Sequence, residues 1–170
     1  TPENTAIAGD SAGGGLAVAA LVAIKDSGLP IPGAGLCLSP WVDMEGTSDS
    51  FESRSHLDPS VQRAGILAFA GMYLDGADPK SPLASPIHAD LSGLPPLIIQ
   101  VGTSETLYDD AIWLRDAATK AGVDVTFEVW EGMIHVWHRF ASKVPDGKKA
   151  IDNLGKFVQA KLGAGVASAD

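Results

Sequence analysis

The chain has 170 residues, of which 45% are hydrophobic, and its formal net charge is −9. This length and apolar content suit one folded domain with a buried core, and the acidic balance disfavours binding to nucleic acid. The longest apolar stretch, at 12–24, holds three consecutive glycines and is shorter than the roughly 20 residues that cross a bilayer, so we expect no membrane span.

The N-terminal part of the chain predicts a strand, a sharp turn and a helix. Residues 5–8 are a short apolar run, and small and aliphatic residues then continue at helical length over 13–25. A second buried strand is predicted at 33–38, because a Ser-Pro pair closes an apolar run there. Within this strand, Cys37 is interpreted as a packing residue, with a reactive thiol as the alternative.

The rest of the chain continues the alternation of strands and helices. Polar and small residues predict a loop over 41–58, and Pro59 is expected to open a helix in which apolar side chains recur as far as Tyr73. The remaining predicted elements are a loop at 75–94, a strand at 97–101, a helix at 108–121, a strand at 123–130, a helix at 148–162 and a frayed tail at 163–170.

This order of elements predicts an α/β fold with a parallel sheet flanked by helices. Strands that are joined by helices pack as parallel neighbours through right-handed crossovers. Four strands make a thin sheet whose edges would be exposed, which indicates that further strands belong to the complete fold. Residues 1–170 are therefore assigned to one domain, as part of a larger α/β unit.

The sequence Gly9-Asp10-Ser11-Ala12-Gly13 matches the Gly-X-Ser-X-Gly nucleophile elbow and lies between the first strand and the first helix. A turn this tight holds its serine in strained geometry and brings strand and helix so close that larger side chains would clash. The serine would then project beside a helix N-terminus, which favours the negative charge of a tetrahedral intermediate. Ser11 is the predicted nucleophile, and a glycine-rich helix start without function is the alternative.

A histidine on the loop after the last predicted strand is the predicted base. Gly132-Met-Ile-His135 follows that strand directly, and a loop in this place can reach back over the end of the sheet. An imidazole suits proton exchange with Ser11 at neutral pH. His138 is the alternative, although nothing in its sequence surroundings distinguishes it.

Three carboxylates compete for the role of the acid, all in the loop that follows the strand at 97–101. Glu105 lies nearest the strand end and is best placed to hold the imidazole in one tautomer. Asp109 is the next candidate, and both it and Asp110 also fit the first turn of the following helix, where the helix dipole favours negative charge. The resulting chain order of serine, acid and histidine is the one that the elbow architecture requires.

Two His-X-Asp pairs, His56 with Asp58 and His88 with Asp90, raise the question of a metal site. Each is a single pair in a predicted loop and lacks the third ligand of a zinc site, so both pairs are interpreted as polar residues of exposed loops. The glycine runs lack the other parts of a nucleotide-binding motif. We therefore expect no metal and no cofactor.

These residues together resemble the bacterial hormone-sensitive-lipase-like (family IV) esterases of the α/β-hydrolase superfamily. The resemblance covers nearly the whole chain and rests on Gly9-Asp-Ser-Ala-Gly-Gly14, on Ser39-Pro-Trp41 with Asp43, and on Gly132-Met-Ile-His135. The acid motif of the family reads Asp-Pro-Leu, a variable residue and Asp or Glu, whereas this chain reads Glu105-Thr-Leu-Tyr-Asp109. This departure is similar to the branch of the family that uses glutamate as its acid.

The resemblance also implies a missing partner. Such enzymes have an N-terminal half with a cap and a His-Gly-Gly-Gly oxyanion loop, and no such sequence precedes Ser11. The chain is therefore expected to be a fragment, the C-terminal half of an α/β-hydrolase, with Ala12 and Gly13 as its own oxyanion donors. Because losing one donor lowers the rate by about 10² to 10³, we expect a poor catalyst that a second polypeptide with the missing half would rescue.

What the resemblance implies about function is the hydrolysis of short-chain acyl esters through an acyl-enzyme. A serine peptidase or amidase of the same fold is one alternative, and a binding module without the chemistry is another. Trp41, Tyr73, Met133 and Trp137 either line the substrate pocket or pack in the interior. The expected partners are a small-molecule ester, the N-terminal half and, through the strand at 123–130, a second copy. A cytoplasmic location is expected, with any N-terminal targeting segment not visible.

Overall fold

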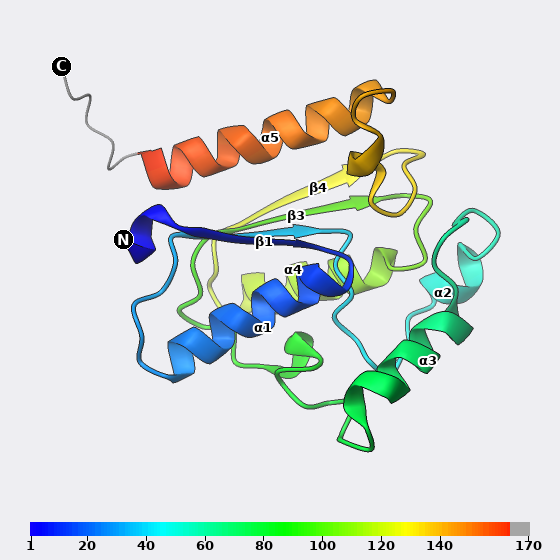
Figure 1. Cartoon of the computed structure of the whole chain (residues 1–170), viewed down its shortest axis with the longest axis horizontal. Helices are drawn as coiled ribbons and strands as arrows, with labels where there is room; N and C mark the ends of the chain where they lie inside the picture. The colour runs from blue at the N-terminus through cyan, green and yellow to red at the C-terminus, as the bar shows by residue number, and fades with distance from the viewer. Residues whose placement is uncertain (164–170) are drawn as a thin grey trace.

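The described part of the chain, residues 1–163, forms a parallel sheet of four strands whose order in space, β1-β2-β3-β4, repeats their order in the sequence (Figure 1). The structure is a computed structural model. The strands are β1 (Ala6–Asp10), β2 (Ala34–Leu38), β3 (Leu97–Gly102) and β4 (Val125–Trp130). The longer helices are α1 (Ala12–Asp26), α3 (Arg63–Leu74), α4 (Tyr108–Lys120) and α5 (Pro145–Leu162). The shorter ones are η1 (Pro2–Asn4), α2 (Ser50–Ser53), η2 (Pro86–His88) and η3 (Trp137–Phe140).

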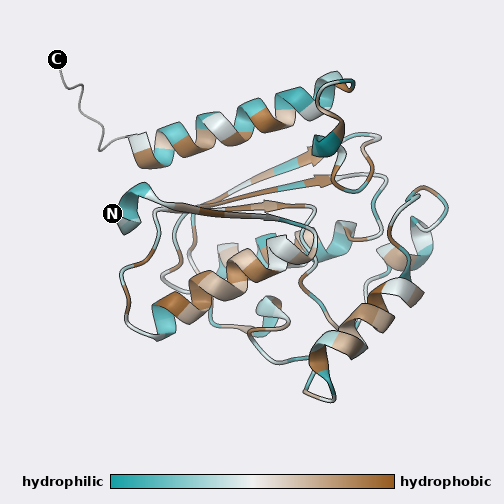
Figure 2. Ribbon diagram, viewed as in Figure 1, coloured by the Kyte–Doolittle hydropathy of each residue, from teal (hydrophilic) through white to brown (hydrophobic). Residues whose placement is uncertain are grey.

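Helices cover both faces of this sheet. On one face α1 packs against β1 and β2, and α4 packs against β3 and β4, whereas α5 lies over β2 and β3 on the other face (Figure 1). The apolar side of α5 faces the strands, and its polar residues face outwards (Figure 2). Because the strands are parallel, their carboxyl ends lie at the same edge of the sheet, and the loops that carry the candidate site residues gather there.

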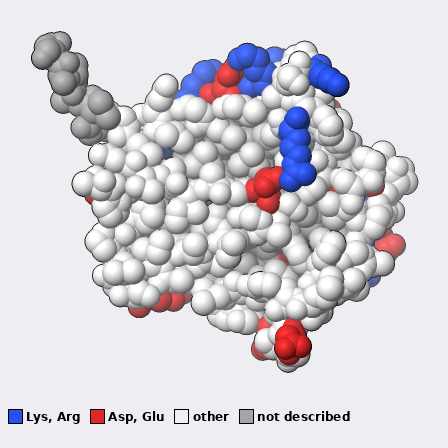
Figure 3. Space-filling view, in the orientation of Figure 1, with Lys and Arg blue, Asp and Glu red and all other residues white. Residues whose placement is uncertain are grey.

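The two outer strands are less buried than the inner ones. Every residue of β3 is buried, and only the last residue of β2 is partly exposed, because helices cover both faces of these strands. Within residues 1–163, β1 and β4 each pair with a single neighbour. The face of the molecule that carries β1, α1 and α3 holds few charged side chains (Figure 3). This face therefore presents an unpaired strand edge beside a surface that carries few charges.

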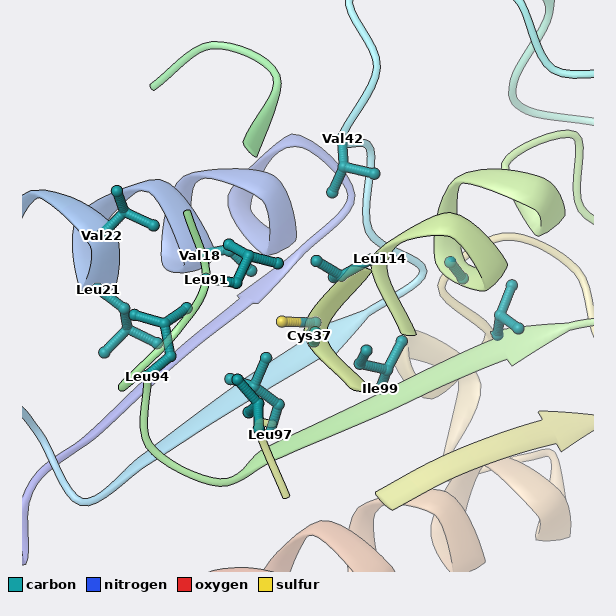
Figure 4. Packing of buried hydrophobic residues seen from close by; sticks show 14 residues of the cluster. Val18, Leu21, Val22, Cys37, Val42, Leu91, Leu94, Leu97, Ile99 and Leu114 are labelled. Carbon is teal, nitrogen blue, oxygen red and sulfur yellow. The ribbon is translucent and has the colours of Figure 1, made fainter. Parts of the chain in front are cut away.

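The main core lies between the sheet and the helices α1 and α4. Its buried side chains include Val18 and Leu21 of α1, Cys37 of β2, Ile99 of β3 and Leu114 of α4 (Figure 4). Cys37 is fully buried among them, and burial raises the pKa of its thiol to about 12. The thiol therefore stays uncharged and packs as a small apolar side chain, as the sequence predicted.

The predicted strands and long helices are confirmed to within three residues at each end, except at the start of α3. Pro59 does not open that helix, which begins at Arg63. The Asp58 carboxylate accepts hydrogen bonds from the N–H groups of Ser60 (2.9 Å) and Val61 (3.0 Å), so these residues form a turn before the helix. The two predicted loops also contain the short helices α2 and η2.

Two further expectations concern the C-terminus and the membrane. Of the frayed tail predicted at 163–170, residues 164–170 lie outside the described residues. Among the helices of residues 1–163, none is both long enough and apolar enough to cross a membrane.

Candidate active site

Ser11 lies on a sharp turn between β1 and α1, at the carboxyl end of the sheet. Its backbone has φ 56° and ψ −123°, a region that non-glycine residues rarely adopt. The turn is held by neighbouring backbone, because the Ser11 N–H donates to the carbonyl of Leu38 (2.9 Å) and the Ser11 carbonyl accepts from the Trp41 N–H (3.0 Å). A side chain at Gly9 would overlap the carbonyl of Gly13, so only glycine permits this approach of strand and helix.

The predicted oxyanion donors, Ala12 and Gly13, are the first two residues of α1. The N–H groups of a first helical turn have no helical carbonyl one turn earlier to bond. The N–H groups of the following residues, Gly14 and Gly15, donate to the carbonyl of Ser11 at 2.9 and 3.3 Å. The N–H groups of Ala12 and Gly13 are directed to the N-terminal end of the helix, where an anion beside the serine would lie.

His135 and Glu105 are joined by a hydrogen bond of 2.9 Å between Nδ1 and Oε2. The Glu105 side chain is fully buried and that of His135 is 9% exposed, so the pair is shielded from water. The second oxygen of Glu105 accepts hydrogen bonds from the Gly102 N–H (2.6 Å) and the Ser39 hydroxyl (2.8 Å). The carboxylate is thus held on both oxygens and orients the imidazole, whose Nε2 is directed away from it.

Ser39 joins the loop that carries the acid to the loop that carries the histidine. Besides donating to Glu105, its hydroxyl accepts a hydrogen bond from the Val136 N–H (3.2 Å). Both residues have positive φ, 48° for Ser39 and 51° for Val136, and for a β-branched residue this is an outlier. With Ser11, three of the four non-glycine residues of positive φ in the described chain therefore lie at this site. Such strain persists only where the surroundings enforce it.

The loop after β4 reaches back across the ends of the strands. A side chain at Gly102 would overlap the backbone carbonyl of Met133, so this loop lies directly on the end of β3. Further along, Arg139 Nη2 pairs with Asp10 Oδ2 at 2.7 Å, at the end of β1. In the described chain no hydrogen bond joins the serine hydroxyl to the imidazole, and such contacts commonly tighten only when substrate binds.

The other two carboxylates of the acid loop bind the segment that follows β2. Asp109 Oδ2 accepts a hydrogen bond from the Ser50 N–H (2.8 Å), and Asp110 Oδ2 accepts two from backbone N–H groups, at 3.0 and 3.1 Å. Both aspartates lie in the first turn of α4, as predicted. The imidazole pairs with Glu105 instead, and Asp109, the alternative acid, serves to hold a loop.

The buried Asp110 carboxyl makes stability depend on pH. Burial raises the pKa of Asp110 to about 7, with further repulsion from Asp43 and Asp109, against backbone hydrogen bonds from Val42 and Asp43 that lower it. The unfolded chain loses this proton at about pH 4, whereas the folded chain keeps it to about pH 7. Through this group, the free energy of unfolding therefore falls as the pH rises from about 4 to about 7.

We expect Asp110→Asn to remove this part of the pH dependence, because asparagine keeps an oxygen for the two backbone bonds and cannot ionise. Urea unfolding of the parent chain and the variant between about pH 4 and about pH 8 measures the difference. Asp152→Asn, on the exposed side of α5, is the control and should behave as the parent. An identical pH dependence in Asp110→Asn and the parent would contradict the prediction.

His138 differs from His135 in its surroundings. It lies on η3, is only 6% exposed, and its Nε2 is 2.8 Å from Gln100 Oε1. Burial lowers the pKa of His138 to about 4, so this imidazole is neutral at pH 7. Its contacts tie η3 to β3, and it bonds no carboxylate in the described chain.

Not every residue of the two His-X-Asp pairs lies on the surface as predicted. That interpretation is wrong for Asp58, which is only 3% exposed because its carboxylate binds N–H groups of two loops. His88 approaches Asp43 and Glu45, so that one ligand atom of each lies within 4.8 Å of the others. Both oxygens of Asp43 already accept N–H bonds from its own loop, at 2.9 and 3.0 Å, and so close that loop.

A pocket of about 700 Å³ opens beside Ser11, between α1, the segment after β2 and α3. Of the four candidate pocket residues, Trp41 and Tyr73 line it, whereas Trp137 is buried and Met133 lies on the histidine loop. The other lining residues are mainly apolar and include Leu16, Met44, Val61, Ile66, Phe69 and Leu83. Such a lining suits the hydrocarbon part of a ligand.

Known proteins match the chain along most of its length. The profile of the alpha/beta hydrolase fold family matches residues 1–139. An acetyl-hydrolase from Streptomyces hygroscopicus is 48% identical over 165 residues, which make up 97% of this chain and 55% of that protein. An esterase from Acinetobacter venetianus is 33% identical over 157 residues, 92% of this chain and 52% of that protein.

A solved structure shows the same likeness in three dimensions. The crystal structure of an esterase from the bacterial hormone-sensitive lipase (HSL) family superposes with a TM-score of 0.94 at 52% identity. The superposition covers 95% of this chain and 55% of that chain. The chain thus spans about half the length of the curated relatives that it matches.

Proposed function

Because the chain belongs to the alpha/beta hydrolase fold family, and within it to the bacterial hormone-sensitive-lipase-like esterases, we propose that it carries the catalytic residues of a carboxylic-ester hydrolase. In this proposal Ser11 is the nucleophile, His135 the base and Glu105 the acid. The observation that supports it most strongly is the 2.9 Å hydrogen bond between His135 Nδ1 and the buried Glu105 carboxylate. A histidine oriented in this way exchanges protons through Nε2.

The proposed reaction proceeds through an acyl-enzyme. His135 Nε2 takes the proton of the Ser11 hydroxyl while the serine oxygen attacks the ester carbonyl carbon. The oxyanion that forms lies at the start of α1, where the N–H groups of Ala12 and Gly13 stabilise it. The imidazolium then gives its proton to the departing alcohol as the C–O bond breaks. A water molecule, deprotonated by the same imidazole, releases the carboxylic acid and restores the serine.

Short-chain acyl esters are the proposed substrates. The pocket beside Ser11 is mainly apolar, which supports an uncharged acyl group rather than a charged one. The relative from Streptomyces hygroscopicus is named acetyl-hydrolase, which agrees with a small acyl group. No cofactor takes part in this reaction, since the three side chains supply nucleophile, base and orientation.

The proposed enzyme includes a second component. We assign residues 1–170 to the C-terminal half of the catalytic unit and propose that an N-terminal half covers the face of β1, α1 and α3. Within residues 1–163, β1 has an unpaired edge, and Phe69 and Met72 of α3 are 61% and 70% exposed. The length of the relatives, about twice the matched span, supports a partner of this size.

A hybrid protein tests the proposed function. In this hybrid, the part of the Streptomyces hygroscopicus acetyl-hydrolase that the chain does not match, which we assign to the N-terminal half, is joined to Thr1. We expect it to hydrolyse p-nitrophenyl acetate and butyrate faster than the decanoate, and to leave the corresponding p-nitroanilides intact. Faster cleavage of the anilides would favour an amidase. Ester binding without turnover, and without modification of Ser11 by a fluorophosphonate, would favour a binding module.

A further inference from the structure

The segment around α2, residues 50–61, lies against the loop that carries the proposed acid, and we call it the clamp segment. The Ser50 hydroxyl donates to the carbonyl of Thr106 (2.6 Å). The Arg54 guanidinium donates to the carbonyl of Thr103. The clamp segment therefore binds backbone on both sides of the acid, from a part of the chain about 50 residues away in sequence.

Asp58 is the residue of the clamp segment that binds the acid loop most directly. Its Oδ2 accepts hydrogen bonds from the Thr106 N–H (2.9 Å) and from the Thr106 hydroxyl (3.2 Å). Its Oδ1 accepts from the Ser60 N–H (2.9 Å), the Ser60 hydroxyl (2.9 Å) and the Val61 N–H (3.0 Å). Both carboxylate oxygens are thus fully used, in a side chain that is almost completely buried.

The two groups of partners belong to two different parts of the site. Thr106 is the next residue after Glu105, so its N–H fixes the peptide plane that carries the acid. Ser60 and Val61 line the pocket beside Ser11. Asp58 therefore connects the wall of the pocket to the backbone of the acid, through direct hydrogen bonds at both ends.

From this juxtaposition, and resting on the hydrolase function proposed above, we propose that Asp58 is a positioning residue that holds Glu105 in place through Thr106 and couples it to the pocket wall. It contacts neither the substrate nor the reacting atoms. Asp58 affects the rate only by positioning Glu105, which must keep the imidazole of His135 oriented toward the serine.

The carboxylate, rather than an amide, is required in this place. Each oxygen faces only donors, and an asparagine would turn its NH₂ group toward one of the two sets. Leaving buried donors unsatisfied would loosen either the acid loop or the pocket wall. Burial raises the pKa of Asp58, but hydrogen bonds from Thr106, Val61 and Ser60 outweigh it and hold this pKa below its ordinary value. The group is therefore ionised at neutral pH.

A double-mutant cycle in the hybrid protein tests the proposal. We expect Asp58→Asn to lower kcat for p-nitrophenyl acetate by about 10- to 100-fold, because small displacements of a positioned group have effects of this size. In the Glu105→Gln background, the same substitution should produce no further loss of kcat. Asp58 affects kcat only by positioning the Glu105 carboxylate, and that carboxylate is absent there. A residue that only stabilised the fold would lower activity by the same factor in both backgrounds.

Asp78→Asn is the matched control. Asp78 also accepts a backbone N–H bond two residues ahead, from Lys80 at 2.9 Å, but it is exposed and does not bind the acid loop. This variant should keep the parent kcat in both backgrounds. If Asp58→Asn does not fold, Thr106→Val, which removes only the hydroxyl bonds, should give a smaller loss that is again absent in the Glu105→Gln background.

Equal losses in both backgrounds, or an unchanged kcat in Asp58→Asn, would overturn the assignment of Asp58. The parent hybrid and its Ser11→Ala variant, measured in the same series, separate this failure from that of the hydrolase function. If Ser11→Ala abolishes turnover while Asp58→Asn does not slow it, only the inference about Asp58 is rejected. If the parent shows no turnover, or turnover that survives Ser11→Ala, the proposed function is rejected and the inference with it.

Discussion

Replacing Ser11 by alanine should lower the hydrolysis of p-nitrophenyl butyrate by the hybrid protein by a factor of about 10⁴ to 10⁶. The serine oxygen forms the acyl-enzyme in the proposed mechanism, and alanine leaves the elbow without a nucleophile. The remaining rate would come from the oxyanion donors and substrate binding alone. Steady-state kinetics measure the loss, and mass spectrometry after fluorophosphonate treatment shows whether Ser11 is the residue modified in the parent.

Ser27→Ala is the matched control for this experiment, because it changes an exposed serine at the other end of α1 and should keep the parent rate. His135→Ala should be about as slow as Ser11→Ala, and the double variant no slower than either, since residues that act as a unit are not additive. Turnover that survives the loss of Ser11 would exclude the mechanism.

The isolated chain should hydrolyse p-nitrophenyl butyrate about 10² to 10³ times more slowly than the hybrid. The N-terminal end of α1 offers the N–H groups of Ala12 and Gly13, and the proposed N-terminal half adds a further donor to the oxyanion. Removing one such donor typically lowers kcat by this factor. The comparison of kcat for the two proteins, at equal concentrations of active serine, measures the effect.

Complementation in trans provides the second half of this comparison. The N-terminal half, added as a separate polypeptide, should raise the rate of the isolated chain toward that of the hybrid. Leu67→Asp, at a position of α3 that is 43% exposed and does not line the pocket, should weaken this rescue without changing the rate of the chain alone, because it places a charge in the face proposed to be covered. Equal rates for the isolated chain and the hybrid would contradict the proposal of a missing half.

The elbow was predictable from sequence because its constraints are local. Gly9 and Gly13 must approach one another within a single turn, and Ser11 must follow a strand and precede a helix, which hydrophobic patterns reveal. The order of strands was equally accessible, since each predicted strand pairs with the next one in the chain. The ends of the elements were harder to predict. The predicted start of α3 at Pro59 was wrong, because the buried Asp58 carboxylate holds a turn before the helix.

What could not be predicted depends on contacts between distant segments. The sequence predicts Asp58 to be a polar residue of an exposed loop, and only the packing of the clamp segment against Thr106 buries it. The sequence places Ser39 in a segment that resembles the family. Its hydrogen bond to Glu105 could not be predicted, because the two residues are 66 positions apart in the chain. The roles of the tryptophans were open for the same reason, because whether an aromatic side chain meets a pocket or the core is decided by tertiary packing.

The strained backbone at Ser11, Ser39 and Val136 places this site in conflict with the stability of the fold. Conformations of this kind cost on the order of 1–3 kcal/mol each, a substantial share of the roughly 5–15 kcal/mol by which domains are stable. Glycine at Ser11 or Ser39 would relieve the strain while removing a hydroxyl that the proposed chemistry uses. Selection of this chain for heat resistance alone should therefore recover substitutions at these positions and, with them, proteins that melt higher and have lost their activity.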